Sequence, residues 1–265
     1  MCLILTAYRA DPRYRLVLAA NRDEYFRRPT KAADYWPEMP HILGGRDLGK
    51  GGTWLAVTTD GRWAAVTNFR SDNAQPVGAR SRGALVADYL AGPSEAQAYV
   101  ASVEPNQHAY PGFNLLTGDN NSLHYLSNMD AGPILLAPGI YGLSNHLLDS
   151  PWPKVELGKR ALAESLAAAD KPDRLIETLL AALGNRSLAE DHALPSTGIS
   201  RDWEKRLSAA FIEAPHYGTR ASTVLLIDRE GEAHFRERSY GERGELIEDR
   251  RYRFTLTAQR SGPTF

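Results

Sequence analysis

The chain repeatedly places two short apolar runs on either side of a tight turn, and this pattern constrains its fold more than any other feature. The clearest turn is Asp60-Gly61, because a two-residue Asp-Gly connection between strand-like runs is a strong hairpin signal. The paired runs are residues 2–8 with 15–20, 53–58 with 63–68, 113–117 with 123–127, and 222–228 with 232–239. Residues 251–256 form a last predicted strand. Hairpins join antiparallel neighbours, so mainly antiparallel sheets are predicted.

Helical segments fall in two blocks between these hairpins. The predicted helices are residues 81–91, 94–103, 153–169 and 172–183. In the last of them, apolar residues follow the i, i+3, i+4, i+7 spacing of a helix with one buried face, and Gly184 ends it. The order is therefore strands, helices, strands, helices, strands. This order excludes a doubly wound parallel fold, in which strands and helices alternate singly, and it predicts an α+β fold.

Composition and charge narrow the function. The formal net charge is -1, so no overall positive field attracts nucleic acid or anionic lipid. No stretch reaches the roughly 18 apolar residues of a membrane span, and the first residues lack a secretory leader. The chain has one cysteine, and its seven histidines show no metal-ligand spacing. We expect a cytoplasmic protein with one domain over residues 1–265, a small-molecule or lipid-like ligand, no stable membrane insertion and no metal. By composition, residues 184–197 are the most flexible region and the tail after Thr257 is frayed.

Cys2 is the candidate nucleophile. Once Met1 is removed, the thiol of Cys2 lies beside its own α-amine. An α-amine has a pKa of about 7.7 to 8.0 and a thiol one of about 8.5, so the two can exchange a proton near neutral pH. The alternative is a buried strand residue, since free cysteine is among the most buried residue types.

Polar residues lie at the ends of two predicted strands and of one further short run, residues 141–144. Asn21-Arg22-Asp23-Glu24 comes directly after the second strand, where Arg22 can lower the thiol pKa and Asp23 can accept a hydrogen bond from the α-ammonium. Asn68 and Asn145 end the runs 63–68 and 141–144, and side-chain amides there can donate to an oxyanion. Ordinary turns with a surface ion pair are the alternative.

Two later features concern ligand binding. Arg220 precedes the most hydrophobic late strand, where it can bind a carboxylate or phosphate or anchor its loop. The glycine-rich residues 44–45 and 49–52 could approach a phosphate of a ligand, but they match neither a P-loop nor GxGxxG, so we interpret them as loops. The chain contains no GxSxG, which leaves a serine-hydrolase elbow unsupported.

Taken in order, these motifs resemble the NRDE or TANGO2-like family (DUF833). The resemblance extends from the first residue to about Asp228. It rests on Met1-Cys2-Leu3-Ile4, Asn21-Arg22-Asp23-Glu24, Gly51-Gly52-Thr53-Trp54, Thr67-Asn68-Phe69-Arg70, Ser144-Asn145 and Tyr217-Gly218-Thr219-Arg220. The resemblance implies the four-layer αββα sandwich of the N-terminal-nucleophile (Ntn) hydrolases.

A more distant similarity, to the choloylglycine hydrolase and penicillin V acylase branch, implies roles. The catalytic set that it implies is Cys2, Arg22, Asp23, Asn68, Asn145 and Arg220. The substrate-binding set is Arg22, Trp54, Phe69 and Arg220. The chain departs from that branch in two places, because Arg22 and Asp23 are adjacent rather than separated by two residues, and because His146 follows Asn145.

Two hypotheses follow from the residues and the resemblance. The first is a cysteine amidohydrolase that cleaves a small nonpeptide C–N bond, in which Cys2 attacks, Asn68 and Asn145 hold the oxyanion, and Asp23 orients the amine. The second is a noncatalytic carrier of a lipid-like, acyl-CoA or haem ligand, since TANGO2-like proteins are associated with Golgi organisation, lipid metabolism and haem handling. Neither requires a resident cofactor. Haem would be a carried ligand, with Cys2 or His146 as an axial ligand.

Overall fold

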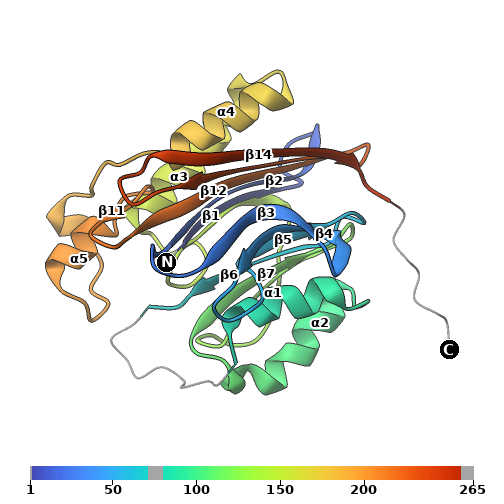
Figure 1. Ribbon diagram of the computed structural model, residues 1–265, viewed down its shortest axis with the longest axis horizontal. Coiled ribbons are helices and arrows are strands. Elements are labelled where there is room, and N and C mark those ends of the chain that lie inside the picture. Colours follow the sequence, from blue (N-terminus) through green and yellow to red (C-terminus); the bar gives the residue numbers. More distant parts are fainter. Residues whose placement is uncertain (1, 71–79, 258–265) are drawn as a thin grey trace.

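The computed structural model describes residues 2–70 and 80–257, and two antiparallel sheets form its centre (Figure 1). The first sheet has the strand order β10-β1-β2-β12-β13-β14, with β11 paired to β12. Its strands are β1 (Cys2–Tyr8), β2 (Tyr14–Tyr25), β10 (Gly139–Leu143), β11 (Glu213–Ala214), β12 (Tyr217–Asp228), β13 (Glu232–Tyr240) and β14 (Leu246–Thr255). The second sheet runs from β3 to β9 in chain order. Its strands are β3 (Thr30–Trp36), β4 (Met39–Asp47), β5 (Leu55–Thr58), β6 (Trp63–Asn68), β7 (Phe113–Gly118), β8 (Leu123–Ser127) and β9 (Ile134–Leu135).

Helices cover the outer face of each sheet. The elements are α1 (Arg82–Ala91), α2 (Ala96–Val103), α3 (Pro153–Ala168), α4 (Pro172–Leu183) and α5 (Arg201–Arg206), with short 3-10 turns η1 (Glu104–Ala109) and η2 (Asp191–Ala193). Figure 1 shows α3 and α4 on one side of the paired sheets and α1 and α2 on the other. In the part of the chain that the structure describes, no helix is long and apolar enough to cross a membrane.

Three apolar cores hold the layers together, and the alternation of side chains along each strand produces them. In β1, Leu3 and Leu5 face α3 and α4, whereas Ile4 faces the second sheet. The side chains of β5 alternate in the same way, since Val57 packs between the two sheets and Ala56 packs under α1. A strand presents successive side chains to opposite faces, so apolar residues on both faces require a layer on each side. The four-layer αββα order is therefore confirmed.

The predicted hairpins are all present. β1 pairs with β2, β5 with β6, β7 with β8, and β12 with β13, each in antiparallel register. Gly61, in the Asp60-Gly61 turn, has φ +90°, a conformation that a residue with a Cβ rarely adopts. The four predicted helices also form, with ends within a few residues of those expected.

The hairpin of β3 and β4 and the short helix α5 were not predicted. Residues 30–47 contain Pro37, Pro40 and the Gly44-Gly45 pair, which obscure the alternation that marks a strand. The structure explains Gly44, because a Cβ there would lie 2.5 Å from the Cβ of Ala56 on the neighbouring strand. The interpretation of residues 44–45 as a loop was therefore wrong, since both lie within β4.

The ends of two predicted strands also differ. The second strand does not stop before Asn21 but continues to Tyr25, so Asn21-Arg22-Asp23-Glu24 is part of β2. The last strand begins at Leu246 rather than at residue 251. The expectations for Met1 and for the tail beyond Thr257 fall outside the described residues.

Candidate active site at the end of the two sheets

A cleft of about 660 Å³ opens where the ends of β1, β2 and β6 meet the start of α1. This size is in the range that holds a small molecule. Residues of the predicted site that line it are Cys2, Arg22, Asp23, Trp54 and Asn68. Residues of the predicted site that do not line it are Phe69, Asn145 and Arg220.

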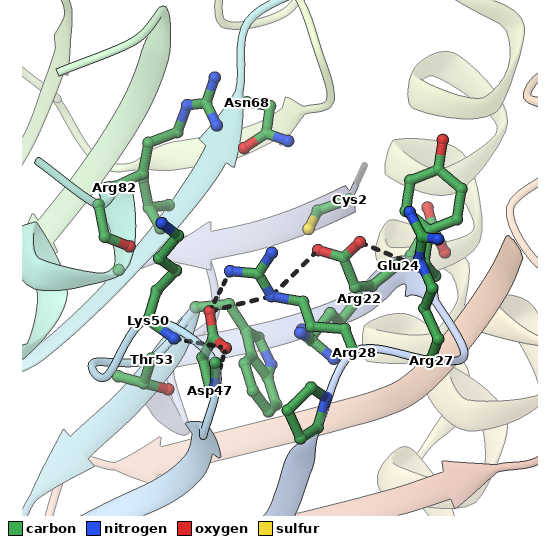
Figure 2. A pocket seen from close by; sticks show the side chains of 18 residues that line it. Cys2, Arg22, Glu24, Arg27, Arg28, Asp47, Lys50, Thr53, Asn68 and Arg82 are labelled. Carbon is green, nitrogen blue, oxygen red and sulfur yellow. Dashed lines mark hydrogen bonds and ion pairs between the residues drawn. The ribbon is translucent and has the colours of Figure 1, made fainter. Parts of the chain in front are cut away.

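Cys2 lies at the first described position of β1, directly opposite Arg22 of β2. Its carbonyl oxygen accepts a hydrogen bond of 3.0 Å from the hydroxyl of Ser144, which fixes the strand beside β10. Figure 2 shows the sulfur pointing into the cleft. Burial raises the pKa of the Cys2 thiol, the negative charge of Asp23 adds to this effect, and the charge of Arg22 opposes it. The thiol is therefore accessible from the cleft, but its ionisation requires a nearby group that favours the thiolate.

Asp23 lies next to Arg22 in β2 and is fixed by hydrogen bonds from two residues of β12. It is 2% exposed, and its Oδ1 accepts a hydrogen bond of 2.6 Å from the hydroxyl of Thr219. The hydroxyl of Tyr217 donates to the Asp23 carbonyl oxygen at 3.1 Å. Burial raises the pKa of the Asp23 carboxyl, whereas the charges of Lys154 and Arg22 lower it. β12 thus fixes the carboxyl of Asp23, which follows the residue of β2 that pairs with Cys2.

Arg22 is a buried cation at the wall of the cleft. It is 5% exposed, its guanidinium carbon lies 4.1 Å from the centre of the Trp54 ring, and its Nη1 donates to the hydroxyl of Thr30 at 3.2 Å. Burial lowers its pKa from an ordinary value far above neutrality, and the charges of Cys2 and Glu24 oppose that shift. A fixed positive charge beside the thiol favours the thiolate.

The two asparagines have different places. Asn68 ends β6 in the second sheet, is exposed to the cleft, and its side-chain amide makes no hydrogen bond to any described residue. Asn145 is fully buried, and its Nδ2 donates to the carbonyl oxygen of Asn68 at 2.9 Å. The carbonyl oxygen of Asn145 also accepts from the backbone N–H of Arg70 at 2.7 Å. Asn68 can therefore donate to a ligand, and Asn145 positions Asn68.

Arg220 and Phe69 lie outside the cleft for identifiable reasons. In the pairing of β12 with β2 the register shifts between Thr219 and Ala221, so Arg220 occupies a bulge. Its Nη1 donates to the carbonyl oxygens of Tyr25 and Arg28, at 3.2 and 2.8 Å. Arg220 lines a separate pocket of about 200 Å³, which we call the second pocket.

Phe69 follows β6 and packs on the ring of His146, with the ring centres 5.0 Å apart. Arg22 and Trp54 line both pockets and so form the wall between them.

The sequence did not predict several cations of the site, among them Arg27 and Arg28, which line the cleft. Lys50 and Arg82 line it as well. Lys154, in the first turn of α3, is 4% exposed, and its Nζ donates to the carbonyl oxygen of Leu207 at 2.9 Å. Burial lowers the pKa of Lys154 to about 8, and the charges of Asp23 and Cys2 oppose that shift. Position in a helix alone gives no sign that a lysine is buried, so no pattern marks Lys154. Among residues 2–70 and 80–257 no cluster of His, Cys, Asp or Glu has the geometry of a metal site.

Several known proteins are similar to this chain. The model of the family "Transport and Golgi organisation 2" matches residues 1–242. The bovine Transport and Golgi organization protein 2 homolog is 39% identical over 90% of this chain and 93% of its own length. The human homolog is 38% identical over 97% of this chain and 99% of its own length. A solved structure of a mutant conjugated bile acid hydrolase from Clostridium perfringens covers 100% of both chains, with a TM-score of 0.48 and 10% identity. The chain belongs to the Transport and Golgi organisation 2 (TANGO2) family.

Proposed function

We propose that the protein is an N-terminal-nucleophile cysteine amidohydrolase that acts on a small molecule with a nonpeptide C–N bond. The observation that carries this proposal is the approach of three groups from three strands to one cleft. Cys2 and Asp23 come from β1 and β2 of one sheet, and Asn68 comes from β6 of the other. These are the groups that a thiol nucleophile, an amine-orienting carboxylate and an oxyanion donor require.

The proposed reaction begins after Met1 is removed. The α-amine of Cys2 accepts the thiol proton, and the sulfur forms a bond to the carbonyl carbon of the substrate. The side-chain amide of Asn68 donates to the oxygen that becomes negative, and Asp23 holds the α-ammonium. The ammonium proton passes to the leaving nitrogen as the C–N bond breaks, which leaves a thioester on Cys2. Water then hydrolyses the thioester and restores the thiol.

The second candidate is a noncatalytic binding protein that uses the same cleft. The observation in its favour is that cations from β2, from the loop before β5 and from α1 line this cleft, an arrangement that can bind a ligand whether or not Cys2 reacts, and burial raises the pKa of the Cys2 thiol. Of the two axial ligands named for haem, Cys2 lines the cleft but His146 does not, and the Nδ1 of His146 lies 2.7 Å from the hydroxyl of Ser150.

Comparison of two forms of the same protein tests the enzymatic proposal. One form is made in cells with methionine aminopeptidase and the other is made with that enzyme inhibited, and intact mass identifies each. A panel of N-acyl derivatives of a fluorogenic amine with acyl chains of increasing length serves as substrate. We expect hydrolysis by the processed form and loss of activity in the form that retains Met1 and in Cys2→Ala.

Two results would contradict the amidohydrolase. One is equal hydrolysis by the processed protein and by Cys2→Ala. The other is a lack of hydrolysis by a processed protein that still binds the acyl compounds, which would support the carrier. Cys2→Ser is the conservative control, because a hydroxyl keeps the geometry but is a weaker nucleophile at neutral pH.

A further inference from the structure

The charges that line the Cys2 cleft do not balance. The cations are Arg22, Arg27, Arg28, Lys50 and Arg82, and the acids are Asp23, Glu24 and Asp47. Arg28 forms ion pairs with two of these acids, because its guanidinium lies 3.7 Å from the Glu24 carboxylate and 2.5 Å from the Asp47 carboxylate. Asp47 also accepts the backbone N–H groups of Gly49 and Lys50, at 3.0 and 3.3 Å. The carboxylates on the cleft wall are therefore already occupied.

Arg82 and Lys50 have no such partner. Neither side chain forms an ion pair with a carboxylate anywhere in the described ranges 2–70 and 80–257. The Nε of Arg82 donates to the carbonyl oxygen of Gly112 at 2.8 Å, which fixes one edge of the guanidinium and leaves its terminal nitrogens for a ligand. Burial lowers the pKa of Arg82, with the charge of Glu24 opposing that shift. A partly desolvated cation without a carboxylate costs free energy unless an anion joins it.

The surroundings of Arg82 also suit an anion. Arg82 is the first residue of α1, a helix of 10 residues with no acidic residue in its first turn. Ser81 and Gly83, on either side of it, line the cleft as well. The first N–H groups of a helix and its dipole favour negative charge at this end. Figure 2 shows Arg82 and Lys50 on the wall across from Glu24 and Arg27, with Cys2 between the two walls.

We propose that the cleft holds an acidic group of the molecule presented to Cys2, a carboxylate or a phosphate, and that Arg82 and Lys50 bind it. This inference adds a substrate class to the proposed amidohydrolase. Only the word substrate rests on that function, because the anion site itself does not require catalysis. An acid held on the α1 wall would orient the reacting carbonyl toward Cys2, because both lie in one cleft of about 660 Å³. Arg22, which contacts Trp54 and lies opposite Cys2, remains available to the thiolate.

The test uses the charge preference of Cys2 alkylation and does not require turnover. Cys2 is the one cysteine in the chain, so every thiol alkylation event reports on the cleft. The second-order rate constants for iodoacetate and iodoacetamide are measured at matched ionic strength, and their ratio is divided by that of 2-mercaptoethanol. We expect a normalised ratio of about ten or more, because clefts with one sign of charge concentrate the opposite ion by that order. The ratio should fall as salt is added.

Variants assign the effect to residues. Lys50→Gln and Arg82→Gln should each lower the ratio several-fold while the iodoacetamide rate stays within about twofold, and Arg82→Lys should restore part of it. Lys50 is exposed, so Lys50→Gln keeps the test valid if Arg82→Gln does not fold. Arg174→Gln, on the exposed side of α4, is the matched control and should leave the ratio unchanged. A normalised ratio near one, or a ratio that neither Gln variant lowers, would overturn the proposal.

Competition distinguishes the two acids. Acetate and methyl phosphate are each added during iodoacetamide labelling at constant ionic strength. Protection by acetate at the lower concentration assigns a carboxylate, and protection by methyl phosphate at the lower concentration assigns a phosphate. Protection by neither would overturn the anion site. Because this readout is labelling, it can fail while the fluorogenic amides are hydrolysed, and it can succeed while they are not.

Discussion

Glu237 should make the protein less stable as the pH rises, and Glu237→Gln should remove that dependence. The side chain lies on β13 at the wall of the second pocket and is 2% exposed. Its Oε1 accepts the backbone N–H of Ala33 at 2.7 Å, and its Oε2 accepts the hydroxyl of Thr223 at 3.0 Å. Burial raises the pKa of Glu237 to about 6 from an ordinary 4.5, although these two hydrogen bonds and the charge of Arg22 oppose the shift.

The sign and size follow from linkage. A carboxyl with a higher pKa in the folded state binds its proton more tightly there than in the unfolded chain. Its contribution to stability is therefore fully present below the unfolded pKa and is lost as the pH rises through the folded pKa. A shift of about 1.5 pKa units corresponds to roughly 2 kcal/mol, lost between about pH 4.5 and just above pH 6.

Urea unfolding of wild type and Glu237→Gln at about pH 4 and about pH 7.5 measures this quantity. A glutamine can still accept from the N–H of Ala33, and its amide can donate to Thr223 once that hydroxyl rotates. The free energy of unfolding of the variant minus that of wild type should be about 2 kcal/mol more positive at the higher pH than at the lower, because only wild type loses stability as the pH rises. Thr223→Val removes one hydrogen bond to the carboxylate and should enlarge the pH dependence. A difference between wild type and Glu237→Gln that is equal at both pH values would refute the reasoning.

Two further predictions concern the Cys2 cleft. Asn145→Ala should lower the free energy of unfolding by about 1–3 kcal/mol in urea, because it removes a fully buried side chain and the hydrogen bond that this side chain donates to the Asn68 carbonyl oxygen. Asn68→Ala should leave stability nearly unchanged and lower hydrolysis about 10²–10³-fold. Equal losses of stability in the two variants would contradict this division. Lys154→Met removes a buried cation that the charges of Cys2 and Asp23 stabilise, so the pH of half-maximal Cys2 alkylation by iodoacetamide should rise, and a fall or no change would contradict it.

The sequence predicts this fold well where local signals act alone. The turn at Asp60-Gly61 needs a residue that accepts φ +90°, and α4 carries one apolar face, so both are visible without a structure. It fails where distant residues determine the conformation. Gly44-Gly45 is suited to a strand because β5 and the ring of Trp54 approach it closely, at 2.5 and 2.3 Å from an added Cβ. No pattern within residues 30–47 contains that contact.

The site shows the same division. Cys2, Asp23 and Asn68 reach one cleft because each ends a strand or lies near its end, and the order of motifs along the chain is enough to suggest them. Lys154 and Asn145 do not line the cleft. Lys154 donates a hydrogen bond to the carbonyl oxygen of Leu207, and Asn145 donates one to the carbonyl oxygen of Asn68. Their partners lie 53 and 77 positions away in sequence, which places the contacts beyond any local pattern.

Arg220 was predicted to line the cleft and does not, whereas Arg82 lines it and was not predicted. The direction in which a side chain points is therefore harder to predict than its place along the chain. Side chains alternate along a strand with a period of two, so a single bulge reverses the face of every residue on one side of it. The bulge between Thr219 and Ala221 keeps Thr219 on Asp23 and leaves Arg220 at the second pocket. Among the cations that do line the cleft is Arg82, which was not predicted and whose direction depends on how α1 packs on β6 and β5. Recognition of an acidic ligand would therefore depend on the docking of α1, so a change at that interface should alter ligand charge preference while Cys2 and Asp23 remain in place.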